Sequence, residues 1–178
     1  MAAFAAIFVG VKFASLAGVR TYIMEQVLNA ISAIRFNAMN LLAMREHSAK
    51  ELRVKLERKF TCSESIDAAI NSLVEQGLQS DERFAQAFVA MRQRQGKGVM
   101  IIRLELREKG VAAELISNCI DDDDVVWSEL VREVWYKKYR GVFPNDARER
   151  AKQVRFLHSR GFTSKQIKSV FEAEVDDQ

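Results

Sequence analysis

Few side chains in this sequence have the type and spacing that catalysis requires. The two histidines, His47 and His158, each precede a serine, and a histidine beside a hydroxyl is a possible base–nucleophile pair. Neither pair has an evident acid partner, and Ser48 is better explained as the cap of a helix. We therefore predict no catalytic residue and a protein that is not an enzyme.

Metal ions and phosphate groups also lack a recognisable site. The run Asp121–Asp124 does not have the alternating ligands and the glycine of a calcium loop, and it is more typical of a solvated linker before a helix that starts at Val125. Cys62 and Cys119 have no metal-ligand spacing and are expected to be reduced, buried thiols. Gly96–Gly98 is a short hinge and not a phosphate-binding loop. We predict no metal and no cofactor.

Basic residues, in contrast, are segregated along the chain. Residues 132–168 contain eleven lysines and arginines and three acids, and residues 92–109 contain six basic and two acidic residues, although the net charge of the whole chain is only +3. Such bands with aromatic neighbours are typical of surfaces that meet phosphate backbones or acidic proteins. The alternative is an ordinary solvated helix face. For the band over residues 132–168 we favour a surface that faces a partner.

The elements that position these bands repeat at a fixed period. A skeleton of leucine, three residues, glycine or an aromatic residue, five residues and isoleucine occurs at Leu56–Ile66, Leu106–Ile116 and Leu157–Ile167. Such a period indicates a repeated supersecondary unit. Each copy predicts helix–turn–helix, and a longer helix precedes each one, over 37–46, 81–95 and 125–140. We expect an all-α protein with three tandem three-helix repeats in an elongated, curved array.

Local signals place the turns of these repeats. Ser48 and Thr61 each precede a glutamate at capping-box spacing, and Gly110 suits the left-handed residue after a helix. The first turn has Phe60 in place of glycine and is expected to close differently. Residues 99–106 alternate enough to pass for a strand, but the repeat register favours a helix there.

We divide the chain into an apolar extension with a lead-in helix (1–36), module 1 (37–78), module 2 (79–122) and module 3 with an acidic tail (123–178). Met1–Val19 contains one charge, Lys12, which lies in the wrong place for a signal peptide and interrupts a segment of borderline membrane-spanning length. We favour a non-membrane extension, either helical or without a fold, and expect an amphipathic lead-in helix over 22–36. A cytoplasmic location accompanies the reduced thiols.

Several motifs resemble the RecX family of recombination regulators. Residues 43–52 (AMREHSAKEL) resemble its opening signature, and residues 78–85 (LQSDERFA) resemble its segment between the first and second modules. Residues 94–98 (RQGKG) with Lys109–Gly110 resemble its second core, and residues 155–162 (RFLHSRGF) resemble its third. The resemblance covers residues 37–173, and the apolar extension departs from it.

This resemblance implies a monomeric array that binds RecA filaments on single-stranded DNA and inhibits filament growth, ATP hydrolysis, strand exchange and the coprotease activity of the SOS response. We expect the array to lie in the filament groove, where some cations contact RecA and others contact DNA phosphate. Two alternatives remain: a stand-alone nucleic-acid-binding module and a membrane-anchored helical adaptor. The candidate filament-binding residues are Arg92, Arg94, Lys97, Arg103, Arg107, Lys137, Lys138, Tyr139, Arg140, Arg148, Arg155 and Arg160.

Overall fold

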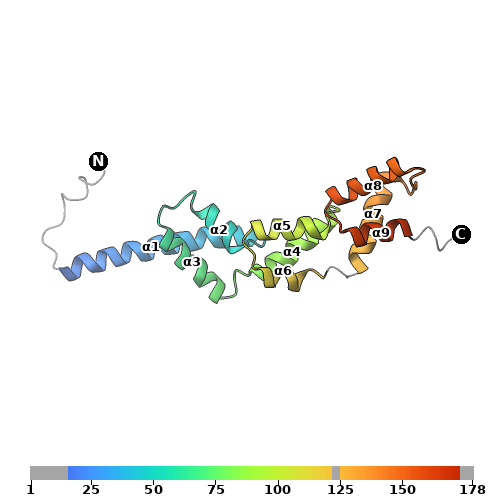
Figure 1. Ribbon diagram of the computed structural model, residues 1–178. Coiled ribbons are helices and arrows are strands. Elements are labelled where there is room, and N and C mark those ends of the chain that lie inside the picture. The colour runs from blue at the N-terminus through green and yellow to red at the C-terminus, as the bar shows by residue number, and fades with distance from the viewer. Residues whose placement is uncertain (1–15, 122–124, 173–178) are drawn as a thin grey trace, which may run out of the picture.

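The computed structural model describes residues 16–121 and 125–172, and all the secondary structure in these ranges is helical. Three helical triplets follow one another in an elongated row (Figure 1). The helices are α1 (Leu16–Met44), α2 (Ala49–Leu56), α3 (Ser63–Glu75), α4 (Asp81–Arg94), α5 (Val99–Glu108), α6 (Ala113–Cys119), α7 (Val125–Tyr139), α8 (Ala147–Ser159) and α9 (Ser164–Glu172). The expected all-α class and the three tandem repeats are confirmed.

Each triplet buries its own hydrophobic core, because its helices present apolar residues at helical spacing toward one another. The skeleton leucines Leu56, Leu106 and Leu157 are almost completely buried, one in each core. The skeleton isoleucines Ile66, Ile116 and Ile167 are buried in the same three cores. The recurring pattern therefore records three serial cores. The second and third are joined by apolar packing, because Trp127 of α7 is buried in the second core and Leu130 packs against both.

The first helix differs from the expectation of a lead-in helix followed by a separate helix over 37–46. α1 is one continuous helix of 29 residues. Its second half belongs to the first core, where Ile34 and Ala38 are buried, while residues 18–30 are exposed. By length and composition alone, Gly18–Met44 could cross a membrane. Residues 1–15, where most of the predicted extension lies, are outside the described residues.

The caps and turns follow the sequence signals in part. Ser48 Oγ accepts a hydrogen bond from the Glu51 amide, as expected. The box expected at Thr61 does not form, because α3 starts two residues later with Cys62 at its N-cap. Gly110 and Gly161 have φ of 82° and 91°, in the left-handed region expected after a helix.

Two further expectations have clear outcomes, and a third lies mostly outside the described residues. The segment that could pass for a strand forms α5, as the repeat register predicted. Cys62 is exposed and Cys119 is half-buried, so the expectation of buried thiols is wrong, although both are free. Of the Asp121–Asp124 linker only Asp121 lies within the described residues, and its carbonyl accepts a hydrogen bond from the Trp127 indole.

Candidate partner-binding groove

A groove of about 490 Å³ lies where the end of α4 meets α7 and α8. Half-buried apolar side chains of Leu130, Val134 and Phe156 form part of its lining. The basic residues that line it come from the second and third triplets: Arg94, Lys137, Lys138 and Arg160. With Glu133 as the one acid of the lining, the groove carries a formal charge of +3.

The ring of Phe156 organises the cations of this groove. Lys138 Nζ lies 5.8 Å and Arg160 Cζ 5.3 Å from the centre of the ring. Tyr139 meets the same ring edge-on, with the two centroids 5.7 Å apart, and partial burial raises the pKa of the Tyr139 hydroxyl. Cation–π contact holds a positive group in place without cancelling its charge. Lys138 and Arg160 therefore lie beside the ring and remain available to an anion.

The structure brings together only some of the candidate filament-binding residues. Four of the twelve line the groove, and Tyr139 supports it through Phe156. Lys137 also pairs with Glu133 at 2.5 Å, which reduces its share of the positive field. The others that do not line it are Arg92, Lys97, Arg103, Arg107, Arg140, Arg148 and Arg155.

Two of these outlying arginines have structural contacts within the second triplet. Arg92 Nε lies 2.7 Å from Glu105 Oε2, and its guanidinium covers the Phe88 ring at 5.0 Å. Arg103 donates to the carbonyl of Ile120 at 3.1 Å. Arg107, Arg148 and Arg155, by contrast, are exposed on α5 and α8.

Sequence reasoning missed the uncharged part of the groove. Phe156, Leu130 and Val134 are not among the candidate residues, because a half-buried apolar residue gives the same sequence pattern as a buried one. Gln93 and Gln95 also line the groove. The sequence signal that could have indicated Phe156 is its position beside Arg155 in a basic helix. The contact of its ring with Lys138 is visible only in the folded structure.

The groove depends on a tight junction between the second and third triplets. The amides of Gly98 and Met100 donate to the carbonyls of Arg160 and Gly161, at 2.8 and 2.9 Å. A Cβ on Gly98 would lie 2.4 Å from the carbonyl carbon of Gly161. The two helix ends can meet this closely only because neither residue has a side chain. This backbone contact fixes α5 against the turn after α8.

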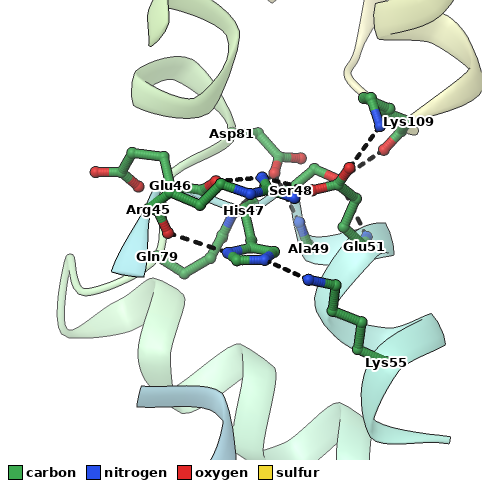
Figure 2. Close-up of polar contacts among 10 residues, drawn as sticks. All are labelled: Arg45, Glu46, His47, Ser48, Ala49, Glu51, Lys55, Gln79, Asp81 and Lys109. Atoms are coloured by element: carbon green, nitrogen blue, oxygen red, sulfur yellow. Dashed lines mark hydrogen bonds and ion pairs between the residues drawn. The ribbon is translucent and has the colours of Figure 1, made fainter. Parts of the chain in front are cut away.

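The junction between the first and second triplets is instead a network of side chains around the loop after α1 (Figure 2). Ser48 Oγ donates to the carbonyl of Lys109 at 2.8 Å, and Lys109 Nζ reaches Glu51 at 2.5 Å. From α4, Asp81 accepts the amide of Ala49 at 2.9 Å. Glu51 thus binds the neighbouring triplet and Arg45, and its carboxylate is not the second half of a capping box.

The same network contains a buried histidine. His47 is 2% exposed, with Nδ1 3.0 Å from the Arg45 carbonyl and Nε2 2.8 Å from Lys55 Nζ (Figure 2). Because the lysine is a donor, Nε2 accepts, and the ring is neutral with its proton on Nδ1. Burial lowers the pKa of His47, and the charges of Arg45 and Lys55 lower it further against the opposing backbone hydrogen bond.

The ionisation of Glu51 is set by two opposing effects, burial and hydrogen bonding. Partial burial opposes its charge, but the hydrogen bonds from Lys109 and Arg45 outweigh burial, so the pKa of Glu51 is lowered. The junction therefore holds an ionised carboxylate and a neutral imidazole side by side at neutral pH. Acid protonates both groups, which changes the charge of the carboxylate and of the imidazole.

Within the described residues, three serial cores and a cationic groove between two of them define a modular helical repeat protein. Sequence models of RecX match all three triplets: the first three-helix domain over residues 37–73, the second over 80–120 and the third over 128–171. These matches cover more than half of the chain. The chain belongs to the RecX family of regulatory proteins.

Curated relatives and solved structures agree with this assignment. The regulatory protein RecX of Pseudomonas fluorescens strain Pf-5 is 44% identical over 144 residues, which cover 81% of this chain and 93% of the relative. That of Ectopseudomonas mendocina strain ymp is 47% identical over 131 residues, covering 74% and 87%. The crystal structure of RecX from Lactobacillus salivarius has a TM-score of 0.71 at 22% identity, covering 85% of this chain and 99% of that one. At this identity it supports the fold alone.

Proposed function

We propose that this protein is a negative regulator of the RecA recombinase. It binds the RecA filament on single-stranded DNA and inhibits filament growth, ATP hydrolysis, strand exchange and the coprotease activity that induces the SOS response. Membership of the RecX family carries this proposal. The charged groove gives it a physical basis, because opposite charge steers association with an anionic assembly.

The array suits a target that is itself extended. Three serial cores present a long surface, and the basic residues of the second and third triplets project from it at several places. The twelve candidate residues remain our proposed contact set, with Arg94, Lys138 and Arg160 in the groove as its centre. Arg92 and Arg103 contribute through the structure of the second triplet as well as through charge.

We further propose that the protein acts in the cytoplasm as a monomer, without catalysis of its own and without a membrane anchor. The second half of the apolar α1 packs in the first core, where Arg35 reaches Ser72 at 3.2 Å. The exposed half, residues 18–30, is about 20 Å long at 1.5 Å per residue, whereas a bilayer core is about 30 Å thick.

The test is RecA ATPase activity on single-stranded DNA with this protein titrated in. We expect inhibition at or below a one-to-one ratio of the two proteins. ATP hydrolysis that continues unchanged at equal ratio would contradict the proposal. A second test, of the proposed location, is fractionation of cells that contain the tagged protein. We expect to recover the protein in the soluble fraction.

A stand-alone nucleic-acid-binding module is the second candidate, favoured by the cations that surround an aromatic ring in the groove. It is distinguished by binding to bare and RecA-coated single-stranded DNA over a range of salt concentrations. The regulator is expected to prefer the coated strand at every salt concentration. Equal affinity for the bare strand, with a steep loss of affinity at higher salt, would favour the second candidate.

A further inference from the structure

The lining of the groove combines aliphatic side chains with cations. We call its half-buried aliphatic residues, Leu130 and Val134, the floor and three of its cations, Arg94, Lys138 and Arg160, the rim. No ion pair is present for these three rim cations within the described part of the chain. A ligand that fills this groove therefore has to supply an apolar group to the floor and anionic groups to the rim.

Single-stranded nucleic acid binds by stacking its bases on open aromatic faces and placing its phosphates on cations. In this groove the aromatic ring is Phe156, and it is occupied by Lys138 and Arg160 over the ring and by Tyr139 at the edge. A base that stacked there would have to displace these cations. A phosphate strand along the rim would place its bases against aliphatic side chains, which offer no aromatic face for stacking.

We infer that the groove binds an acidic peptide segment that carries one apolar anchor residue, with the anchor against Val134 and Leu130 and carboxylates at Lys138, Arg160 and Arg94. The volume of about 490 Å³ is in the range of small-ligand sites and accommodates such a side chain. A cationic rim around an apolar centre is the arrangement of a protein-binding hot spot, with burial at the centre and polar contacts around it. The inference rests on the proposed function, which makes the RecA subunits of the filament the source of the segment.

The site is built by the junction and would not exist on one triplet alone. Gly96 also lines the groove, and a Cβ there would come within 2.8 Å of Val134 Cγ2. Arg160 belongs to the turn whose carbonyl accepts the amide of Gly98. A bound segment therefore contacts both triplets at once, and its affinity depends on their fixed arrangement.

Photo-crosslinking in the inhibited filament decides between peptide and DNA. A benzophenone amino acid in place of Gln95, which lines the groove, is compared with one in place of Asn71, exposed on α3. We expect position 95 to crosslink to RecA, within a segment that mass spectrometry identifies as acidic with an apolar residue. A crosslink to DNA, to a RecA segment without that composition, or no crosslink above the level of position 71 would overturn the inference.

The ATPase of the same samples separates this inference from the proposed function. Inhibition together with a DNA crosslink would agree with the proposed regulator but contradict a peptide-binding groove. Absence of inhibition would contradict both. Val134→Thr provides an independent readout, because it adds a hydroxyl to the floor and leaves the charge unchanged. We expect roughly tenfold weaker binding to the filament. Unchanged binding, with an unchanged circular dichroism spectrum, would contradict an apolar anchor.

Discussion

Gly98 and Gly161, 63 residues apart in sequence, lie backbone against backbone at the junction of the second and third triplets. A Cβ on Gly98 would lie 2.4 Å from both the carbonyl carbon and the carbonyl oxygen of Gly161. A real Cβ does not approach backbone this closely, so a side chain at position 98 has to separate the two triplets. The groove formed by α4, α7 and α8 would widen with them.

Gly98→Ala is therefore expected to loosen this junction while the three cores remain folded. The cost is about 1–3 kcal/mol, as for overpacking of a close contact, and φ at Gly98 is −86°, so no backbone strain adds to it. Hydrogen exchange at the Met100 amide, which donates to the Gly161 carbonyl, should accelerate. Small-angle scattering should detect a broader range of shapes.

Gly77→Ala is the matched control for this substitution. Gly77 has φ of 68° but open space around its Cβ position, so alanine there costs about 1 kcal/mol of backbone strain without a clash. We expect Gly77→Ala to lower stability without changing the scattering profile. If the two variants gave the same profile and the same Met100 exchange rate, close packing of Gly98 would not be what holds the junction.

His47 makes the first junction sensitive to acid. Its pKa is lowered in the folded protein, so the unfolded chain binds more protons as the pH falls below about 6.5, the ordinary value. The stability that a neutral His47 contributes is present above this pH and is lost as the pH falls toward the lowered pKa. The free energy of unfolding of the first triplet should therefore fall between pH 7.5 and 5.5.

His47→Gln is the control that removes the titration and keeps the contacts. The glutamine amide can donate to the Arg45 carbonyl, and its oxygen can accept from Lys55 Nζ, as the two ring nitrogens do. Urea unfolding at several pH values, followed by helix content, compares the two proteins. Equal slopes of stability against pH in this window would show that His47 is not the group responsible.

The pair formed by Glu51 and Lys109 couples the first two triplets and should be measurable as a coupling energy. The side chains are 16% and 29% exposed and their charged atoms lie 2.5 Å apart, so the pair is better shielded than a typical surface ion pair. A double-mutant cycle with Glu51→Gln and Lys109→Met is expected to give about 1 kcal/mol.

An exposed ion pair on one helix serves as the comparison. Lys168 and Glu172 on α9 are 2.9 Å apart with side chains 70% and 58% exposed, and a pair of this type contributes about 0.3–0.5 kcal/mol. The same cycle at this pair should give a smaller coupling energy that disappears at high salt. A coupling no larger at Glu51–Lys109 than at Lys168–Glu172 would contradict a role for the first pair in joining the triplets.

The sequence predicts the repeats better than it predicts how they meet. Leucine and isoleucine periodicity reports burial inside one triplet, which is why α5 was recognised as a helix despite its alternating end. The junctions are made by contacts between distant segments, such as Gly98 with Gly161, Ser48 with Lys109, and Trp127 with the second core. These contacts do not recur at a fixed spacing in the sequence, so the repeat pattern does not indicate them.

The candidate site shows the same division. Clustered charge indicated Lys137, Lys138 and Arg160 as candidates, but charge alone did not distinguish them from Arg92, whose guanidinium is held by Glu105. Phe156 was missed because its contact with Lys138 joins α8 to α7 across a turn. Helical phase within one segment is readable from sequence, whereas the face that one helix offers to another depends on tertiary packing.

Charge reversal in the groove is the most direct test of its place in the proposed regulation. Lys138 and Arg160 lie beside the Phe156 ring and line the groove, so Lys138→Glu with Arg160→Glu replaces two positive groups by two negative ones at its rim. We expect the concentration that half-inhibits RecA ATPase to rise by roughly tenfold or more. The salt dependence of filament binding should become shallower.

Arg58→Glu with Lys168→Glu makes the same change of charge on α2–α3 and α9, at exposed residues outside the groove and outside the candidate set. A long-range effect of net charge would weaken both double variants equally, because both shift the net charge from +3 to −1. A local effect would weaken only the groove variant. Circular dichroism confirms that each variant is folded, and half-inhibition at the same concentration for both would show that the groove has no special part in restraining the filament.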